Sequence, residues 1–137
     1  DVAGQRLASG VWDLKSRRHE GGGMRYVHAH TYMGELLDAY PHSCVGYEEV
    51  RRHLGADAAH VYGGIIGVIT AICEDLKMPY SGIPVKTIKK LATGHGNASK
   101  AEMVIASMQK WCPPYTFLDD EADALWCAEA LRSRVDF

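Results

Sequence analysis

The segment that most constrains the fold is a long apolar stretch at residues 56–76. Its large apolar side chains recur at helical spacing and make one continuous stripe along a predicted helix. That stripe consists of Val61, Ile65, Val68, Ile69, Ile72 and Leu76. Gly63, Gly64 and Gly67 would each cost roughly 1 kcal/mol inside a helix. They therefore predict the close approach of another backbone, such as that of a sheet.

Shorter elements precede and follow this helix. The predicted strands cover residues 5–14, 43–49 and 79–85. The predicted helices cover residues 24–40, 56–76, 85–93, 99–110 and a last segment from residue 119. A capping box between Ser99 and Glu102 indicates where the fourth of these helices begins. Strands that alternate with helices indicate one α/β domain over residues 1–137.

Composition narrows the class of protein. The fractions of hydrophobic (47%) and charged (23%) residues are those of an ordinary soluble globule. With a net charge of −2, an anionic partner must meet a local basic patch, and the charged run at 15–20 is interpreted as a solvated loop. Four widely spaced cysteines without a Cys-x-x-Cys pair indicate reduced thiols inside a cell. We expect neither a membrane-spanning run nor a signal peptide.

Four acids occupy five positions at residues 119–123, directly before an apolar helical pattern. Asp120 and Asp123 are three residues apart, so on a helix they share a face, with Cβ atoms roughly 5–6 Å apart. Two like charges at this spacing favour a divalent cation between them. The alternative is a helix N-terminus, where acids suit the helix dipole and Asp119 or Asp120 is the N-cap. On this stretch alone, the cap is the commoner structure.

A further acid ends the predicted strand at 43–49. Alternation along the strand places Cys44, Gly46 and Glu48 on one face. The carboxyl ends of central strands are where α/β folds place their sites, so Glu48 is a candidate site residue. The alternative is that the strand simply exits to solvent at this point.

Three stretches taken together resemble a known family. They are Val-Gly-Tyr-Glu-Glu-Val at 45–50, the segment from Val-Lys-Thr-Ile to Gly-Asn-Ala-Ser-Lys at 85–100, and Asp-Asp-Glu-Ala-Asp-Ala-Leu at 119–125. In this order and spacing they resemble the RuvC-like Holliday junction resolvases, and their wording is most similar to the phage and prophage members. The resemblance implies an RNase H-like three-layer α/β fold, in which helices flank a mixed central sheet.

The resemblance also implies a metal-dependent endonuclease that cleaves branched DNA by two-metal phosphodiester hydrolysis. Its members hold two Mg²⁺ (or Mn²⁺) ions with four carboxylates. By position, Glu48, Asp120 and Asp123 match three of these acids. The fourth belongs to the first strand, where only Asp1 could fill the position. We therefore expect the chain to be truncated at its N-terminus.

Basic positions carry over in the same way. Lys89 and Lys100 match lysines beside the scissile phosphate, and Lys100 would stabilise the transition state; solvated helix faces are the alternative. Arg51 stands where cellular members carry a wedge Phe, and Arg52 follows it; two arginines at this point favour phosphate contact. The resemblance further implies a homodimer in the cytoplasm of a bacterial or phage-infected cell. Two alternatives stay open: a non-catalytic RNase H-like nucleic-acid-binding module, and a structural α/β domain with an acidic helix cap.

Overall fold

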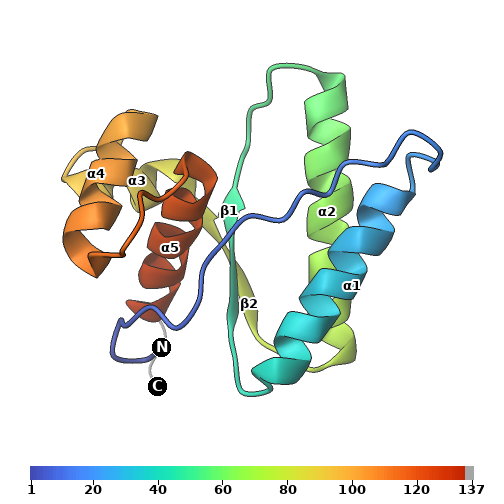
Figure 1. Ribbon diagram of the computed structural model, residues 1–137, viewed down its shortest axis with the longest axis horizontal. Coiled ribbons are helices and arrows are strands. Elements are labelled where there is room, and N and C mark those ends of the chain that lie inside the picture. The colour runs from blue at the N-terminus through green and yellow to red at the C-terminus, as the bar shows by residue number, and fades with distance from the viewer. Residues whose placement is uncertain (135–137) are drawn as a thin grey trace. The chain divides into compact units, whose positions relative to one another are not determined.

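The computed structural model describes residues 1–134 of the 137-residue chain (Figure 1). Its elements are, in order, α1 (Met24–Ala39), β1 (Val45–Glu49), α2 (Ala56–Asp75), β2 (Tyr80–Pro84), α3 (Val85–Thr93), α4 (Lys100–Trp111) and α5 (Asp119–Arg132). The chain divides into two compact units. Unit 1 comprises Asp1–Val11, Gly46–Val50 and the chain from Ser81 onward, and unit 2 comprises Trp12–Val45 and Arg51–Tyr80.

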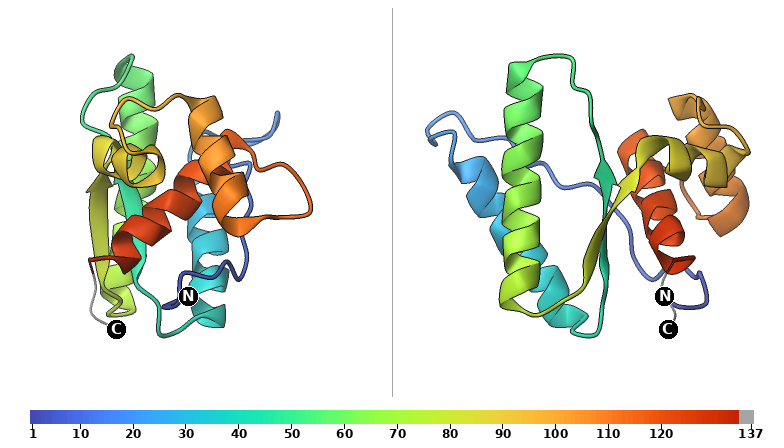
Figure 2. Two further views of the ribbon diagram at one scale, coloured as in Figure 1. Left: turned by 90° about the vertical axis from the view of Figure 1, so that its left-hand side faces the viewer. Right: turned by 180° about the vertical axis from the view of Figure 1, so that it is seen from behind.

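Strands β1 and β2 pair side by side in a two-stranded parallel sheet (Figure 2). Parallel neighbours need a crossover connection of a dozen or more residues, and α2 lies in that connection. The strand predicted at 5–14 is wrong, because these residues form no strand. The prediction rested on apolar Leu7, Val11 and Trp12, but in the described part of the chain no neighbouring strand pairs with the segment, and all three side chains are exposed. Within residues 1–134 the sheet is therefore smaller than the mixed central sheet expected.

Unit 2 contains the predicted helices α1 and α2, which pack on each other. Their core consists of buried Leu37, Ile72 and Cys73, surrounded by Met33, Val45, Val68, Ile69 and Met78. The backbone approach expected at the glycines is wrong at Gly63 and Gly67, where a Cβ atom would meet nothing within 4 Å. At Gly64 a Cβ atom would collide with the ring of Tyr26, a side chain of α1. Gly64 thus allows α1 and α2 to come into contact, and it makes room for the Tyr26 side chain rather than for a backbone.

Helix α2 also corrects the expectation that no apolar run reaches membrane-spanning length. Among the residues described, it is the one helix long and apolar enough for such a span, with 20 residues and a mean hydropathy of 1.5. Length and composition are weak evidence, because core helices of soluble proteins pass the same test. The packing of α2 on α1 covers only part of this helix, because 11% of its apolar window is buried.

Unit 1 is built from α3, α4 and α5, which pack on one another in all three pairings. Its core includes Ile83, Ile88, Met103, Phe117 and Trp126, each buried. The predicted capping box is confirmed. The Glu102 backbone N–H donates to the Ser99 hydroxyl at 3.2 Å, and the Ser99 backbone N–H donates to the Glu102 carboxylate at 2.6 Å. This cap fixes the start of α4.

Candidate functional site

A cavity of about 240 Å³ lies in unit 1 between β1 and the first half of α5. Its lining residues are Gly46, Tyr47, Glu48, Asp120, Asp123, Ala124 and Cys127. The structure thus brings together on one cavity the strand acid and the two helix acids singled out in the sequence. All three belong to the same compact unit.

Strand β1 directs Glu48 toward α5 through its alternation. Gly46 lies two residues before Glu48 and shares its face. A Cβ atom at Gly46 would lie 3.2 Å from Leu131 of α5, so the missing side chain lets strand and helix approach closely. On the sheet, a Cβ atom at Gly82 of β2 would lie 3.1 Å from the ring of Tyr47. The small residues at these two positions therefore make room for Leu131 and for the Tyr47 ring beside the two strands.

Helix α5 presents Asp120 and Asp123 from its first two turns. The helix begins at Asp119, and its N-cap is Leu118, which makes no side-chain cap hydrogen bond. The reading of Asp119 or Asp120 as the N-cap is therefore wrong. An extended backbone at Leu118 starts the helix, with φ −71° and ψ 156°. This leaves the carboxylates of Asp120 and Asp123 to line the cavity.

The cavity concentrates negative charge in a partly desolvated place. Burial raises the pKa of Glu48, the charges of Asp123 and Asp120 raise it further, and Lys89 opposes the shift. Burial also raises the pKa of Asp123, against the pull of Lys89. Such repulsion among half-buried carboxylates is relieved by a cation, and oxygen donors suit hard divalent ions.

The carboxylate oxygens of the cavity are the type of ligand that Mg²⁺ or Mn²⁺ prefers. The side chains are not arranged as a closed coordination shell. Among residues 1–134, no group of three or more His, Cys, Asp or Glu side chains has an arrangement that could hold a metal ion by itself. Glu48 and Asp123 remain under mutual repulsion. A bound cation would have to bring these carboxylates closer together.

Sequence reasoning missed Cys127 in the wall of this cavity. It lies four residues after Asp123, so helical spacing from the acid was the available signal. Burial raises the pKa of this thiol to about 12, and the charge of Glu48 contributes. Cys127 is therefore a neutral, apolar wall at ordinary pH and adds no thiolate for softer metals.

The two candidate lysines differ in their relation to the acids. Lys89 of α3 is half-buried, and its charge lowers the pKa of both Glu48 and Asp123. Lys100 at the start of α4 is exposed and pairs with Asp119, with Nζ 2.9 Å from the carboxylate. This hydrogen bond lowers the pKa of Asp119 and raises that of Lys100. Both lysines therefore act on a cavity acid through their charges: Lys100 also lowers the pKa of Asp123, and Lys89 acts on Asp123 and on Glu48.

The other predicted site residues lie outside the cavity lining. Asp1 accepts hydrogen bonds from the backbone N–H groups of Ala3, at 3.0 Å, and Gln5, at 2.9 Å, and so closes a turn of its own. Arg51 and Arg52 are exposed and belong to unit 2. The structure groups Glu48 with the two α5 acids and does not place these three residues with them.

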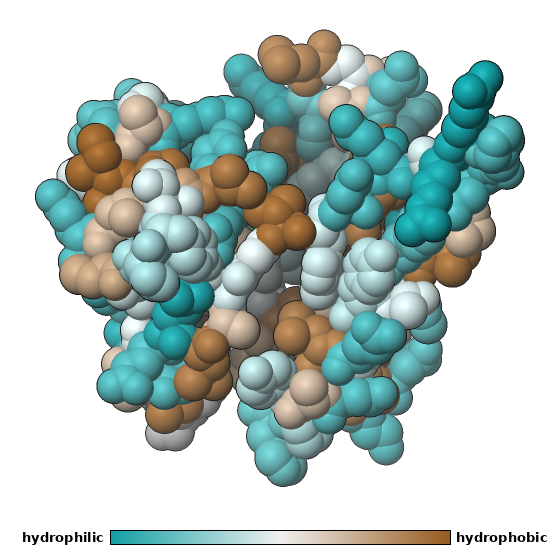
Figure 3. All heavy atoms as spheres, viewed as in Figure 1, coloured by the Kyte–Doolittle hydropathy of each residue, from teal (hydrophilic) through white to brown (hydrophobic). Residues whose placement is uncertain are grey.

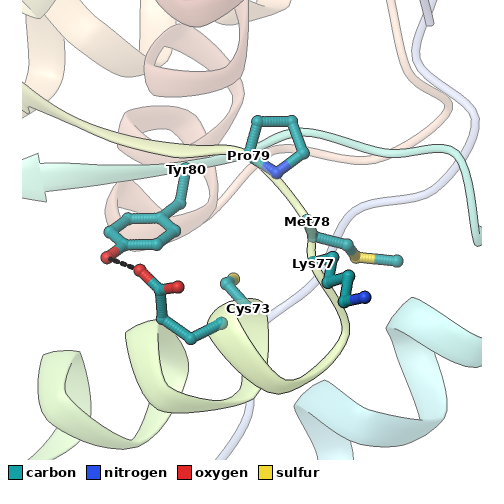
Figure 4. Close-up of a pocket in the computed structure, with 6 residues that line it drawn as sticks. Cys73, Lys77, Met78, Pro79 and Tyr80 are labelled. Carbon is teal, nitrogen blue, oxygen red and sulfur yellow. Dashed lines mark hydrogen bonds between the residues drawn. The ribbon is translucent and has the colours of Figure 1, made fainter.

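A second and larger hollow lies in unit 2 at the end of α2. Its volume is about 500 Å³, and its walls are Cys73, Glu74, Lys77, Met78, Pro79 and Tyr80 (Figure 4). The Tyr80 hydroxyl donates to the Glu74 carboxylate at 2.8 Å. One acid and one lysine on an open surface offer no convergent chemistry. The smaller cavity with its three carboxylates is the better candidate.

Comparison with known proteins bears on the fold. No family profile matches the sequence, and no curated protein matches it. The structure is similar to that of T. thermophilus RuvC in complex with a Holliday junction substrate, with a TM-score of 0.75 and 20% sequence identity. The match covers 88% of this chain and 76% of the RuvC chain. A second Thermus thermophilus RuvC structure matches with a TM-score of 0.69 and 21% sequence identity, over 84% of this chain and 70% of the RuvC chain. These matches establish a RuvC-like fold; at this identity they establish the fold alone.

Proposed function

We propose that this chain is a metal-dependent endonuclease that cleaves branched DNA in the manner of a Holliday junction resolvase. One observation carries the proposal: Glu48 of β1 and Asp120 and Asp123 of α5 line a single cavity within a RuvC-like fold. The RuvC structure it resembles is bound to a Holliday junction, which supports DNA as the substrate. We further propose that the chain forms a full RNase H-like three-layer domain and is related to the phage-type members. We also propose that it acts as a homodimer and is located in the cytoplasm.

The three carboxylates would hold two Mg²⁺ or Mn²⁺ ions, with Asp1 as the proposed fourth ligand. Two such ions supply an activated water and stabilise the leaving 3′-oxygen of a phosphodiester. The chain's own residues prepare the site. Ionised Glu48 and Asp123 are needed as ligands, and the charge of Lys89 favours their ionised forms.

Basic side chains would hold the DNA backbone near the cavity. Lys89 combines partial burial with an electrostatic effect on two of the acids, which supports a position next to the scissile phosphate. Lys100 would leave its pair with Asp119 for a phosphate at little expense, because solvent weakens an exposed ion pair. Arg51 and Arg52 would contact phosphates beyond β1.

A non-catalytic nucleic-acid-binding module is the second candidate. The carboxylate of Asp1 accepts two backbone hydrogen bonds in its own turn, which favours a site with three acids rather than four. A domain whose acids serve only a helix terminus is the third candidate: Asp119, Asp120 and Glu121 do lie in the first turn of α5. The position of Asp120 in the same cavity lining as Glu48 disfavours it.

Cleavage of a synthetic four-way junction tests the proposal. Asp123→Asn should lower Mg²⁺-dependent cleavage by at least about a hundredfold, because a metal ligand is lost, while junction binding in Ca²⁺ stays unchanged. Asp119→Asn is the matched control, because this acid lies on the same helix and pairs with Lys100 outside the cavity lining. Undiminished cleavage by Asp123→Asn would refute the nuclease assignment. Tight junction binding without cleavage by the unaltered chain would favour the binding module.

A further inference from the structure

A surface of unit 2 combines an exposed tryptophan ring, packed beside a half-buried tyrosine, with positive charge, and neither feature has a role in the proposed cleavage site. It consists of Trp12, the basic run Lys15, Arg17 and Arg18, and the ring of Tyr32 on α1; we call it the Trp12 patch. We propose that the Trp12 patch binds single-stranded DNA by stacking on unpaired bases. The choice of DNA rests on the proposed function, whereas the stacking and charge arguments stand independently of it.

The aromatic part is an exposed platform. Trp12 keeps 44% of its surface exposed, and its ring centroid lies 5.6 Å from that of Tyr32, with the planes 44° apart. His28 lies one helical turn before Tyr32, and their rings are nearly parallel, 6.1 Å apart and 16° inclined. The three rings thus support one another while a large part of the indole faces solvent. Exposed aromatic rings are what unpaired bases stack on.

The basic part lies in a loop whose acids are engaged by the loop itself. The Lys15 backbone N–H donates to Asp13 at 3.1 Å, and the Arg17 backbone N–H donates to Glu20 at 2.8 Å. The hydrogen bond from Arg17 is the main reason that the pKa of Glu20 is lowered, so this acid stays ionised and holds the turn. The basic side chains of the run are themselves exposed.

Glu20 also fixes the loop to α1. Its carboxylate lies 3.3 Å from Nε2 of His28, the histidine that stacks on Tyr32. One acid therefore ties the basic turn to the aromatic cluster, and charge and platform are presented together. Hydrophilic atoms cover the region of the loop and the start of α1 at the upper right of Figure 3. A merely solvated loop would require neither this anchor nor an exposed tryptophan beside it.

Charge and shape together select the ligand. In a protein with a net charge of −2, three exposed cations within residues 15–18 form a local positive patch, which complements a phosphate backbone. Paired bases offer no free face to a side chain, so the aromatic rings would be unused by a continuous duplex. A strand with unpaired nucleotides uses both parts. The Trp12 patch shares no residue with the cavity lined by Glu48.

Binding of a fluorescein-labelled twelve-nucleotide oligothymidylate to the full chain tests this proposal. EDTA keeps the measurement independent of cleavage. Trp12→Ala should weaken binding about 5- to 100-fold, the range for loss of one stacked base, whereas Trp12→Phe should retain most of the affinity. Lys77→Ala is the control, since Lys77 is an exposed lysine of the same unit outside the patch. It should bind like the unaltered protein.

A second variant tests the charge without touching the aromatic cluster. Arg17→Ala with Arg18→Ala should reduce the slope of log affinity against log salt by up to about 1.4, at roughly 0.7 per phosphate contact on a single strand. Both side chains are exposed, so thermal unfolding should be unchanged. Equal affinity of Trp12→Ala and the unaltered chain would overturn the proposal. So would equal losses in Trp12→Phe and Trp12→Ala, or tenfold tighter binding of oligouridylate.

The outcome is separable from that of the nuclease proposal. Asp123→Asn should bind oligothymidylate with unchanged affinity, because Asp123 lines the cavity and lies outside the patch. A chain that never cleaves junctions but binds this oligonucleotide through Trp12 would support the Trp12 patch proposal and refute the nuclease proposal. A chain that cleaves junctions but does not bind the oligonucleotide would support the nuclease proposal and refute the Trp12 patch proposal.

Discussion

The hydroxyl of Ser9 donates a hydrogen bond to Oε1 of Glu121 at 2.6 Å, across 112 positions of the chain. The Tyr115 hydroxyl donates to the same oxygen at 2.9 Å, and Glu121 is only 3% exposed. Glu121 lies on α5 between the two acids that line the cavity. Its buried carboxylate therefore binds the N-terminal segment to the helix turn that positions Asp120 and Asp123.

We expect this hydrogen bond to be measurable by a double-mutant cycle. Ser9→Ala and Glu121→Ala should show a coupling free energy of about 1–3 kcal/mol in urea unfolding, the size of a hydrogen bond to a charged group. Ser16→Ala is the control, because no bond joins it to Glu121 and its effect should add to within about 0.5 kcal/mol. Additive effects of Ser9→Ala and Glu121→Ala would show that this hydrogen bond does not couple the N-terminal segment to α5.

The cavity acids should make stability depend on pH. Burial raises the pKa of Glu48 above 4.5 and that of Asp123 above 3.8, so the folded chain binds these protons more tightly than the unfolded chain. Without metal, their contribution to the free energy of unfolding should fall as pH rises from about 4 through the raised values. Asp123→Asn should then be more stable than the unaltered protein at pH 7, by a few tenths of a kcal/mol.

Asp119 provides the control of opposite sign. Its hydrogen bond with Lys100 lowers its pKa, so its contribution to stability is present at neutral pH and lost in acid. Asp119→Asn should therefore be less stable than the unaltered protein at pH 7. Thermal melts in EDTA from pH 3.5 to 8, repeated with Mg²⁺, measure both effects. Mg²⁺ should stabilise the unaltered protein and leave Asp123→Asn nearly unchanged. Stabilisation of both by equal amounts would place the ion elsewhere.

Lys89 and its neighbour Lys90 form a matched pair on α3. Lys89 is half-buried and acts on Glu48 and Asp123, whereas Lys90 is exposed. Lys89→Ala should weaken binding of a four-way junction and reduce the magnitude of the salt slope by about 1, as one phosphate contact is lost. Lys90→Ala should leave the slope unchanged. Fluorescence anisotropy between 50 and about 200 mM salt makes the comparison. Identical slopes for the two variants would show that Lys89 contacts no DNA phosphate.

The glycines of α2 should respond in opposite directions to the same change. Gly64→Ala places a methyl group against the ring of Tyr26, so it should destabilise by about 1–3 kcal/mol through overpacking. Gly63→Ala meets nothing within 4 Å and should stabilise the helix by up to about 1 kcal/mol. Urea unfolding of both variants measures the difference. Changes of the same sign would mean that Tyr26 does not set the helix contact.

Periodic patterns in the sequence predicted the helices well, and they were weaker for the sheet. Apolar spacing placed α1 and α2 within one residue at each end, since the pattern is local to the helix. The apolar residues at 5–14 could not show whether a neighbouring strand was present to pair with. The N-cap prediction was wrong for a related reason. The backbone of Leu118 starts α5, whereas the composition of the segment favoured the acids beside it.

The sequence predicted the three acids that line the cavity, but it did not predict the burial of the residues around them. The resemblance to a known family grouped Glu48 with Asp120 and Asp123, and these residues do line one cavity. Glu121 stood within an acidic run that resembles a solvated surface, yet it is buried. Two hydroxyl groups hold the buried carboxylate, that of Tyr115 and that of Ser9, and Ser9 lies far away in the chain. Contacts of this kind leave no local signal in a sequence.

The position of the cavity acids in the chain has a consequence for its synthesis. Glu48 precedes the α2 crossover, and Asp123 follows it in the last helix. A nascent polypeptide thus carries the strand acid long before its helix counterparts emerge, and closing so long a loop slows assembly. No incomplete translation product that stops before α5 can gather the three acids. Under the proposed chemistry, such a product would be inert toward the genome of the cell that makes it.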